Sequence, residues 1–189
     1  MVLEWREREH EIMDQATLQS APTIHALRTS GILKFFCTSP MRANVRLLEF
    51  MINYWDHDLG MFNLQSETLG ITIEDMYFIT GLSRRGAPVN LEGTGRGGDP
   101  LSVQNYIDVF CTPGTQKRGS CVPIAHSRDF TLQVLTSTIV RIAGSSSLHL
   151  ATRNQMRLAV DCMHGALYDW CLGVVPIMKR QLFDCKRGR

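Results

Sequence analysis

Apolar residues recur at helical spacing along most of this chain. Leu48, Ile52 and Trp55 follow Val45 by three, seven and ten positions, which places all four on one face of an α-helix. Comparable spacing predicts further helices over 22–36, 76–82, 103–110 and 132–142. The charged segment Val2–Leu18 predicts a peripheral helix.

A longer stripe lies near the C-terminus. Six apolar residues from Met156 to Val174 alternate in steps of four and three, which is typical of a buried helix or a helix–helix seam. The 132–142 helix offers only four matching positions, so two arrangements stay open. Either the end of the stripe is partly exposed, or a short helix over 177–183 folds back after Pro176 to cover it. The stripe residues concerned are Leu167, Trp170 and Val174.

One stretch has the period of a β-strand instead. Phe62 and Leu64 alternate with polar residues, as do Leu69 and Ile71, and the polar run 65–68 separates them. This pattern predicts a small hairpin. We therefore expect a mainly α domain of about six to seven helices with one short β-hairpin.

Local signals mark several helix ends. Thr72 and Asp75, and likewise Thr152 and Gln155, have the spacing of a capping box, and Gly81 is a natural left-handed C-cap. Asp99-Pro100 is the expected start of the helix over 103–110. Because the flanking helices bracket the hairpin, we expect Leu48, Trp55 and Ile79 to share one core.

Composition adds little to this picture. The chain of 189 residues carries 20 Lys and Arg against 18 Asp and Glu, and a net charge of +2 does not indicate a nucleic-acid or membrane-surface protein. No run of about 18 apolar residues occurs, and the N-terminus lacks a secretory h-region. The six cysteines form no CxxC pair, so we expect free and mostly buried thiols.

Residues 27–89 carry a series of short motifs in a recognisable order. They are Leu-Arg-Thr-Ser-Gly-Ile-Leu, Leu-Leu-Glu-Phe-Met-Ile-Asn-Tyr-Trp, Met-Phe-Asn-Leu, Gly-Ile-Thr-Ile-Glu-Asp-Met-Tyr-Phe-Ile-Thr-Gly-Leu and Gly-Ala-Pro-Val. This order resembles the plant mobile domain, also called the aminotransferase-like plant mobile domain, of maintenance-of-meristems-like proteins. The resemblance places the domain at 22–189, after an N-terminal extension over 1–21, and implies a truncated or diverged C-terminus.

The resemblance implies a nuclear, non-catalytic protein-interaction module. The family is related to transposon-borne domains and is associated with transposon and gene silencing and with meristem growth. Its implied partners are nuclear proteins, such as a phosphatase-like or a chromatin protein. It does not imply transamination, since pyridoxal phosphate needs a Schiff-base lysine and none of the four lysines lies in a recognisable motif. We expect no cofactor.

Other candidate chemistry is weak. Gly93, Gly95 and Gly98 match the dinucleotide fingerprint by letters, but no strand precedes them. Cys162 and His164 are two apart and diverge on a helix, which disfavours a zinc site. We therefore expect no metal.

A polar group on the expected long helix leaves one catalytic alternative open. Asp161, His164 and Tyr168 share a helix face, and we favour a solvated surface over an acid–base pair. An unrecognised enzyme therefore remains an alternative.

Four basic residues are candidate phosphate contacts. Arg84 and Arg85 follow a helix C-cap, and Lys179 and Arg180 lie near the C-terminus, where Lys186 and Arg187 follow. Such scattered bases predict weak nucleic-acid binding and leave a nucleic-acid-binding domain as the second alternative. No membrane partner is expected.

Overall fold

The computed structural model describes residues 20–38, 45–91, 102–145 and 147–188. Within these ranges it is mainly α-helical, as predicted, and it has eight α-helices and a few short strands where about six to seven helices and one hairpin were expected. The helices are α2 (Ala21–Thr29), α3 (Leu33–Phe36), α4 (Val45–Tyr54), α5 (Ile73–Thr80), α6 (Val103–Phe110), α7 (Phe130–Ile142), α8 (Arg153–Met163) and α9 (Trp170–Lys186), with the 3-10 turn η1 (Ile124–His126). The strands are β1 (Trp55–Asp56), β2 (Met61–Asn63), β3 (Thr68–Gly70), β4 (Ala87–Pro88), β5 (Cys121–Pro123), β6 (Leu150–Thr152) and β7 (Tyr168–Asp169).

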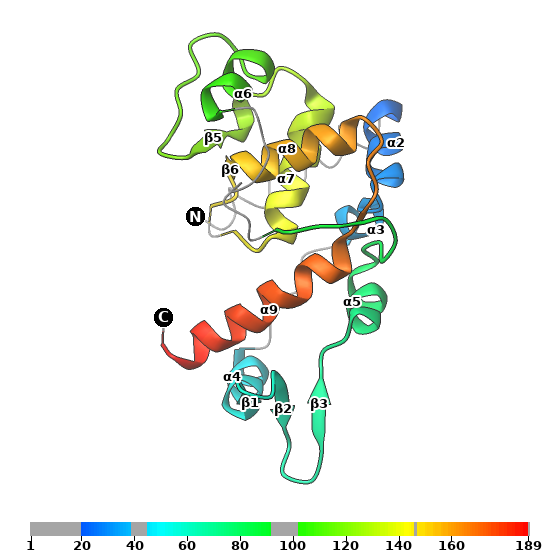
Figure 1. Ribbon diagram of the computed structural model, residues 1–189, viewed down its shortest axis with the longest axis vertical. Coiled ribbons are helices and arrows are strands. Elements are labelled where there is room, and N and C mark those ends of the chain that lie inside the picture. The colour runs from blue at the N-terminus through cyan, green and yellow to red at the C-terminus, as the bar shows by residue number, and fades with distance from the viewer. Residues whose placement is uncertain (1–19, 39–44, 92–101, 146, 189) are drawn as a thin grey trace.

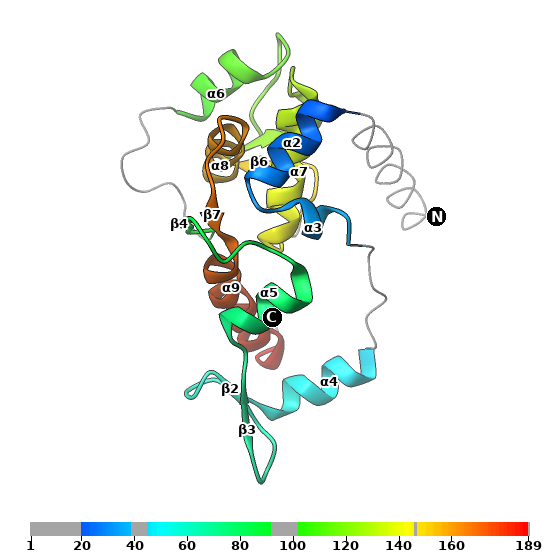
Figure 2. The same cartoon turned by 90° about the vertical axis from the view of Figure 1, so that its right-hand side faces the viewer.

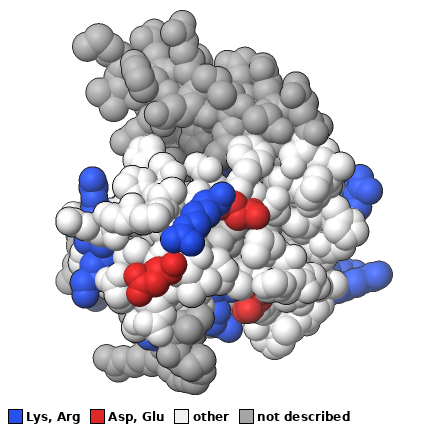
Figure 3. Space-filling view, turned by 90° about the horizontal axis from the view of Figure 1, so that it is seen from above, with Lys and Arg blue, Asp and Glu red and all other residues white. Residues whose placement is uncertain are grey.

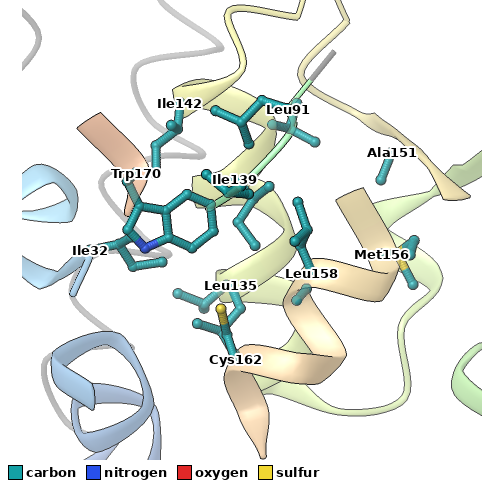
Figure 4. Close-up of a cluster of buried hydrophobic side chains, with 14 of the residues drawn as sticks. Ile32, Leu91, Leu135, Ile139, Ile142, Ala151, Met156, Leu158, Cys162 and Trp170 are labelled. Carbon is teal, nitrogen blue, oxygen red and sulfur yellow. The ribbon is translucent and has the colours of Figure 1, made fainter. Parts of the chain in front are cut away.

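The main core is built around α7. Nine of its thirteen residues are buried, including three threonines and serines, so this helix is covered on all sides. It packs most extensively on α8 and also on α2 (Figure 1). Figure 4 shows Trp170 of α9 among Ile32, Ile139 and Ile142 in this core.

A second part of the molecule lies at the far end of α9. There α9 passes α4 and the three-stranded antiparallel sheet β1-β2-β3 (Figures 1 and 2). The predicted hairpin is confirmed, with Phe62 opposite Leu69, and β1 adds a third strand that pairs Trp55 with Phe62. Two further two-stranded pairs, β5–β6 and β4–β7, were not expected.

The expected shared core of Leu48, Trp55 and Ile79 is wrong. Helix α4 ends at Tyr54, and Trp55 turns into β1, where it is 1% exposed and lies edge-on to Phe62 with ring centroids 5.0 Å apart. Leu48 is 44% exposed and Ile79 is 66% exposed. The helical period continues across the end of α4, so spacing alone did not reveal that Trp55 leaves the helix.

The expected long helix from Met156 to Val174 is also wrong. It breaks after α8, where Gly165 takes a left-handed φ of 89° and β7 then pairs in parallel with β4. A new helix, α9, starts on the Asp169 cap. The end of the stripe is covered, since Trp170 is fully buried and Val174 is 9% exposed, whereas Leu167 remains 39% exposed.

Trp170 and Val174 are not covered by a short helix that folds back after Pro176. Helix α9 runs through that proline to Lys186, so no separate short helix forms. The start of α9 is buried instead by segments from earlier in the chain, among them Ser30, Leu82 and Val89.

The local helix signals are confirmed where the structure describes them. Both capping boxes form, Gly81 adopts the left-handed C-cap with φ 67°, and Pro22 lies in the first turn of α2. Helix α6 begins on a Ser102 cap. The expected helix Val2–Leu18, most of the extension 1–21, the glycine run 92–98 and Asp99-Pro100 lie outside the described residues. None of the described helices combines the length and apolar character needed to cross a membrane.

Candidate functional site

The four predicted phosphate contacts lie in two separate places. Arg84 is paired with Glu74 at 3.2 Å and lies over the Tyr77 ring at 5.4 Å, close to the first turn of α9. Lys179 lies against Gly60 of the β1–β2 turn, next to Arg180. Nine residues of helix separate Lys179 from Trp170, which is about 13 Å of rise. The two pairs therefore do not form one basic cluster.

Acidic side chains accompany several of the basic ones. Figure 3 shows one end of the molecule, where blue and red side chains are scattered without a continuous basic patch. This distribution agrees with a net charge of only +2 and disfavours tight binding along a duplex.

The C-terminal turns of α9 form a groove with the β1–β2–β3 sheet, and we call it the α9–hairpin groove. Its volume is about 880 Å³. It is lined by Asn53, Tyr54, Trp55, Asp56, His57, Asn63, Gln65, Phe183, Lys186 and Arg187.

A stack of three side chains forms one wall of this groove. The His57 ring lies on the Phe183 ring with centroids 3.8 Å apart and an interplanar angle of 28°. The Arg187 guanidinium carbon lies over the same ring at 4.3 Å from its centroid. Phe183 is thus in contact with both an imidazole and a guanidinium.

Charged groups fix the groove's backbone. The Lys186 ammonium donates to the carbonyl oxygens of Trp55 and, at 3.5 Å, Asn53. Asp56 Oδ1 accepts hydrogen bonds from the backbone N–H groups of Asp58 and Leu59 at 3.0 Å each. The segment Asp56–Gly60 therefore forms a turn, and the Asp56 carboxylate is used within it.

The expected polar group on α8 is only partly assembled. Tyr168 donates to Asp161 Oδ2 at 2.8 Å, and Arg157 reaches the same oxygen at 3.4 Å. Burial, together with the adjacent Asp161 carboxylate, raises the pKa of Tyr168. His164 is exposed, caps α8 and lines a different pocket beside His25. The pairing holds β7 against α8 and leaves Tyr168 poorly suited to proton transfer.

The buried thiols lie in apolar surroundings. Burial raises the pKa of Cys162 to about 12 and that of Cys171 to about 11. Cys171 Sγ donates to the Leu82 carbonyl at 3.2 Å. These values describe inert core thiols rather than nucleophiles. Across the described ranges, all six cysteines are free and no group of three His, Cys, Asp or Glu side chains is placed to hold a metal ion.

Exposed large apolar side chains are concentrated in one part of the sequence, on α4, the β1–β2–β3 sheet and α5. Of the thirteen that are exposed among the described residues, nine lie between residues 47 and 79. We call these nine the apolar surface: Leu47, Leu48, Phe50, Leu59, Met61, Leu64, Leu69, Phe78 and Ile79. The most exposed are Phe78 at 79% and Ile79 at 66%.

Sequence reasoning missed the groove. Lys186 and Arg187 were noted as basic residues, but His57 and Phe183 are 126 positions apart and carry no motif that links them. The mostly polar run from Asp56 to Gly60 was the available signal, since such a run favours a turn and turns often carry binding residues.

Comparison with known proteins adds no constraint. No protein-family model, no curated protein and no solved structure matches this chain.

Proposed function

We propose that this chain is a non-catalytic protein-interaction module of the plant mobile domain type that works in the nucleus. The observation that carries the proposal is the apolar surface. Monomeric proteins rarely leave many large apolar side chains exposed together, and such surfaces typically bind other proteins. The motif order over residues 27–89 supports the choice of family and, with it, the nuclear location and a role in transposon and gene silencing and meristem growth.

The apolar surface is exposed because the elements that carry it bury few hydrophobic side chains. Among the described residues of α4 and β1–β3, Trp55 and Phe62 are the buried hydrophobic side chains, and they form one ring pair. Leu47, Leu48 and Phe50 of α4 stay exposed.

The Tyr168 hydroxyl is already hydrogen-bonded to Asp161, and burial raises the pKa of the Cys162 thiol. Both features support a role without catalysis. The proposed partners are nuclear proteins such as a phosphatase-like or a chromatin protein.

Affinity purification from plant nuclei with mass spectrometry tests this proposal. The bait is the 189-residue chain, compared with the double variant Phe78→Ser, Ile79→Ser. Both side chains are largely exposed, so the variant should fold normally and lose the partner. Val109→Ser on α6 is the matched control, since Val109 is 56% exposed but lies outside the apolar surface.

Phosphatase-like or chromatin proteins recovered with the wild type and the control, but lost with the double variant, would support the proposal. A partner list unchanged by the double variant, or no richer than an empty bait, would contradict it.

A further inference from the structure

We propose that the α9–hairpin groove binds a nucleotide unit, with an aromatic base on its stacked wall and a phosphate on its cations. This site would be a second binding function, separate from the protein-interaction module proposed above. It uses different residues from the apolar surface, so either can fail without the other.

The size and openness of the groove suit such a ligand. Its volume of about 880 Å³ lies within the range of roughly 300–1,000 Å³ usual for small-molecule sites. The groove is open along the surface between α9 and the sheet, so a nucleotide within a single strand can enter without its neighbours having to leave.

The wall offers two surfaces for a base. The Phe183 ring carries two planar groups, the His57 imidazole and the Arg187 guanidinium. Both side chains are exposed. Planar imidazole and guanidinium groups are among the side chains on which unpaired bases stack in proteins.

Three amide side chains complete the groove. Asn53, Asn63 and Gln65 are exposed, and none of their amide groups has a hydrogen-bond partner within the described part of the chain. An amide presents a donor and an acceptor together, which is the pattern on the edges of bases. An acidic peptide without aromatic side chains would use the cations and, through its backbone, the amides, but it offers no planar group to the stacked wall, so the wall favours a nucleotide.

Two cations of the groove, Lys186 and Arg187, are available for phosphate contacts. Lys186 is held at the groove edge by the Trp55 and Asn53 carbonyls, which still leaves donor capacity on its ammonium, and Arg187 keeps its N–H groups while it lies over Phe183. The Asp56 carboxylate faces its own turn. Two cations predict a salt dependence of about −1.4 in log affinity against log salt, at about −0.7 per phosphate of a single strand.

Fluorescence anisotropy tests the proposal with a labelled single-stranded oligouridine of about ten nucleotides, a length within the usual site sizes. The full 189-residue chain is titrated at low salt, and free uridine monophosphate, a duplex of equal length and polyglutamate serve as competitors. We expect saturable binding that polyglutamate and the duplex displace poorly. If free uridine monophosphate displaces the labelled strand at the same concentrations as unlabelled strand does, the ligand is a free nucleotide. If it displaces the labelled strand less well, the ligand is a single strand.

Arg187→Ala should weaken binding at least about fivefold, the lower end of the loss of one stacking contact, and should flatten the salt slope by about 0.7. Arg187→Lys should restore the slope but not the full affinity. Arg141→Ala is the matched control. The Arg141 guanidinium carbon lies 5.8 Å from the centroid of the Phe35 ring, beside the main core and away from the groove. His57→Ala repeats the test on the other end of the stack.

A measurement on the unaltered chain keeps the test independent of variant folding. A strand carrying 4-thiouridine should crosslink within residues 53–65 or 183–187. No saturable binding, equal losses in Arg141→Ala and Arg187→Ala, polyglutamate as strong a competitor as the strand, or crosslinks confined to other segments would each overturn the proposal.

Discussion

Two tryptophans with the same burial have different polar surroundings. Trp170 donates its indole N–H to the Ser30 carbonyl at 2.6 Å, and both residues are fully buried. Trp55 is 1% exposed, and its Nε1 has no hydrogen-bond partner among the described residues. Among the described residues, Trp55 Nε1 is thus the one buried side-chain nitrogen or oxygen atom without a hydrogen-bond partner.

Replacing each tryptophan by Phe separates these cases. Trp170→Phe leaves the buried Ser30 carbonyl without its donor, which costs about 1–3 kcal/mol beyond the lost volume. Trp55→Phe removes a donor that was already unpaired. We expect the free energy of unfolding, from urea titration followed by circular dichroism, to fall by at least about 1 kcal/mol more for Trp170→Phe. Equal losses would contradict the assigned hydrogen bond.

Tyr168 is the residue whose ionisation the fold suppresses most clearly. Burial and the Asp161 carboxylate raise its pKa in the folded state above the ordinary value of about 10. Because the pKa of Tyr168 is higher in the folded than in the unfolded state, Tyr168 stabilises the folded protein at pH values below its unfolded pKa. This stabilisation is lost as the pH rises through its folded pKa.

We expect an ultraviolet titration of tyrosine to show a late step at high pH, and Tyr168→Phe to diminish that step. Asp161→Asn should bring the late pKa down, because it removes the neighbouring negative charge. A late step that is unchanged by both Tyr168→Phe and Asp161→Asn would contradict the Asp161 contact.

At the scale of elements, α9 joins the two parts of the molecule. Its first turns lie in the main core, and its last turn reaches α4 and β1 (Figure 1). Gly173 permits a close crossing, since a methyl group added there would lie 2.6 Å from Val89 Cγ1 and 2.9 Å from the Val89 carbonyl oxygen.

Gly173→Ala tests this crossing. Helix propensity alone would stabilise the protein by about 1 kcal/mol, but the contact with the Val89 backbone should cost about 1–3 kcal/mol, so we expect a net loss or no gain. Gly70→Ala is the control, because an added methyl there meets only Met61 at ordinary contact distance of 3.5 Å. Thermal unfolding measures both, and a clear gain for Gly173→Ala would show that the segment at Val89 is not close.

At the scale of the whole molecule, hydrophobic burial is unequal. One large cluster joins α2, α7, α8 and the start of α9, while Trp55 and Phe62 form a small separate one. Local unfolding free energies follow buried apolar contacts, so the part around α4 and β1–β3 should open more easily than α7.

Native-state hydrogen exchange with mass spectrometry measures this difference. We expect faster exchange over residues 45–70 than over 130–163 in the wild type. Trp55→Ala should destabilise its surroundings by about 3–5 kcal/mol, as for other buried tryptophans, and raise exchange over 45–70 while α7 keeps its protection. A uniform increase along the chain would show that the molecule unfolds as one unit.

The amino-acid sequence by itself determined the features that depend on neighbours along the chain. The helical class, the hairpin at Phe62 and Leu69, both capping boxes and the Gly81 C-cap all followed from spacing of four residues or fewer, where sterics and local hydrogen bonds decide. Helix breaks were less predictable, because an apolar stripe continued in phase across Gly165 and across the end of α4 at Trp55.

Only the tertiary structure decided which apolar faces are covered and which side chains meet. Trp170 is buried because Ser30 and Ile139 come to it from distant segments, whereas Ile79 stays exposed because none of the described segments packs over it. The groove likewise exists because α9 brings Phe183 and Arg187 to His57. Such contacts depend on long-range chain closure and on the burial it gains, and no local pattern of residues specifies those.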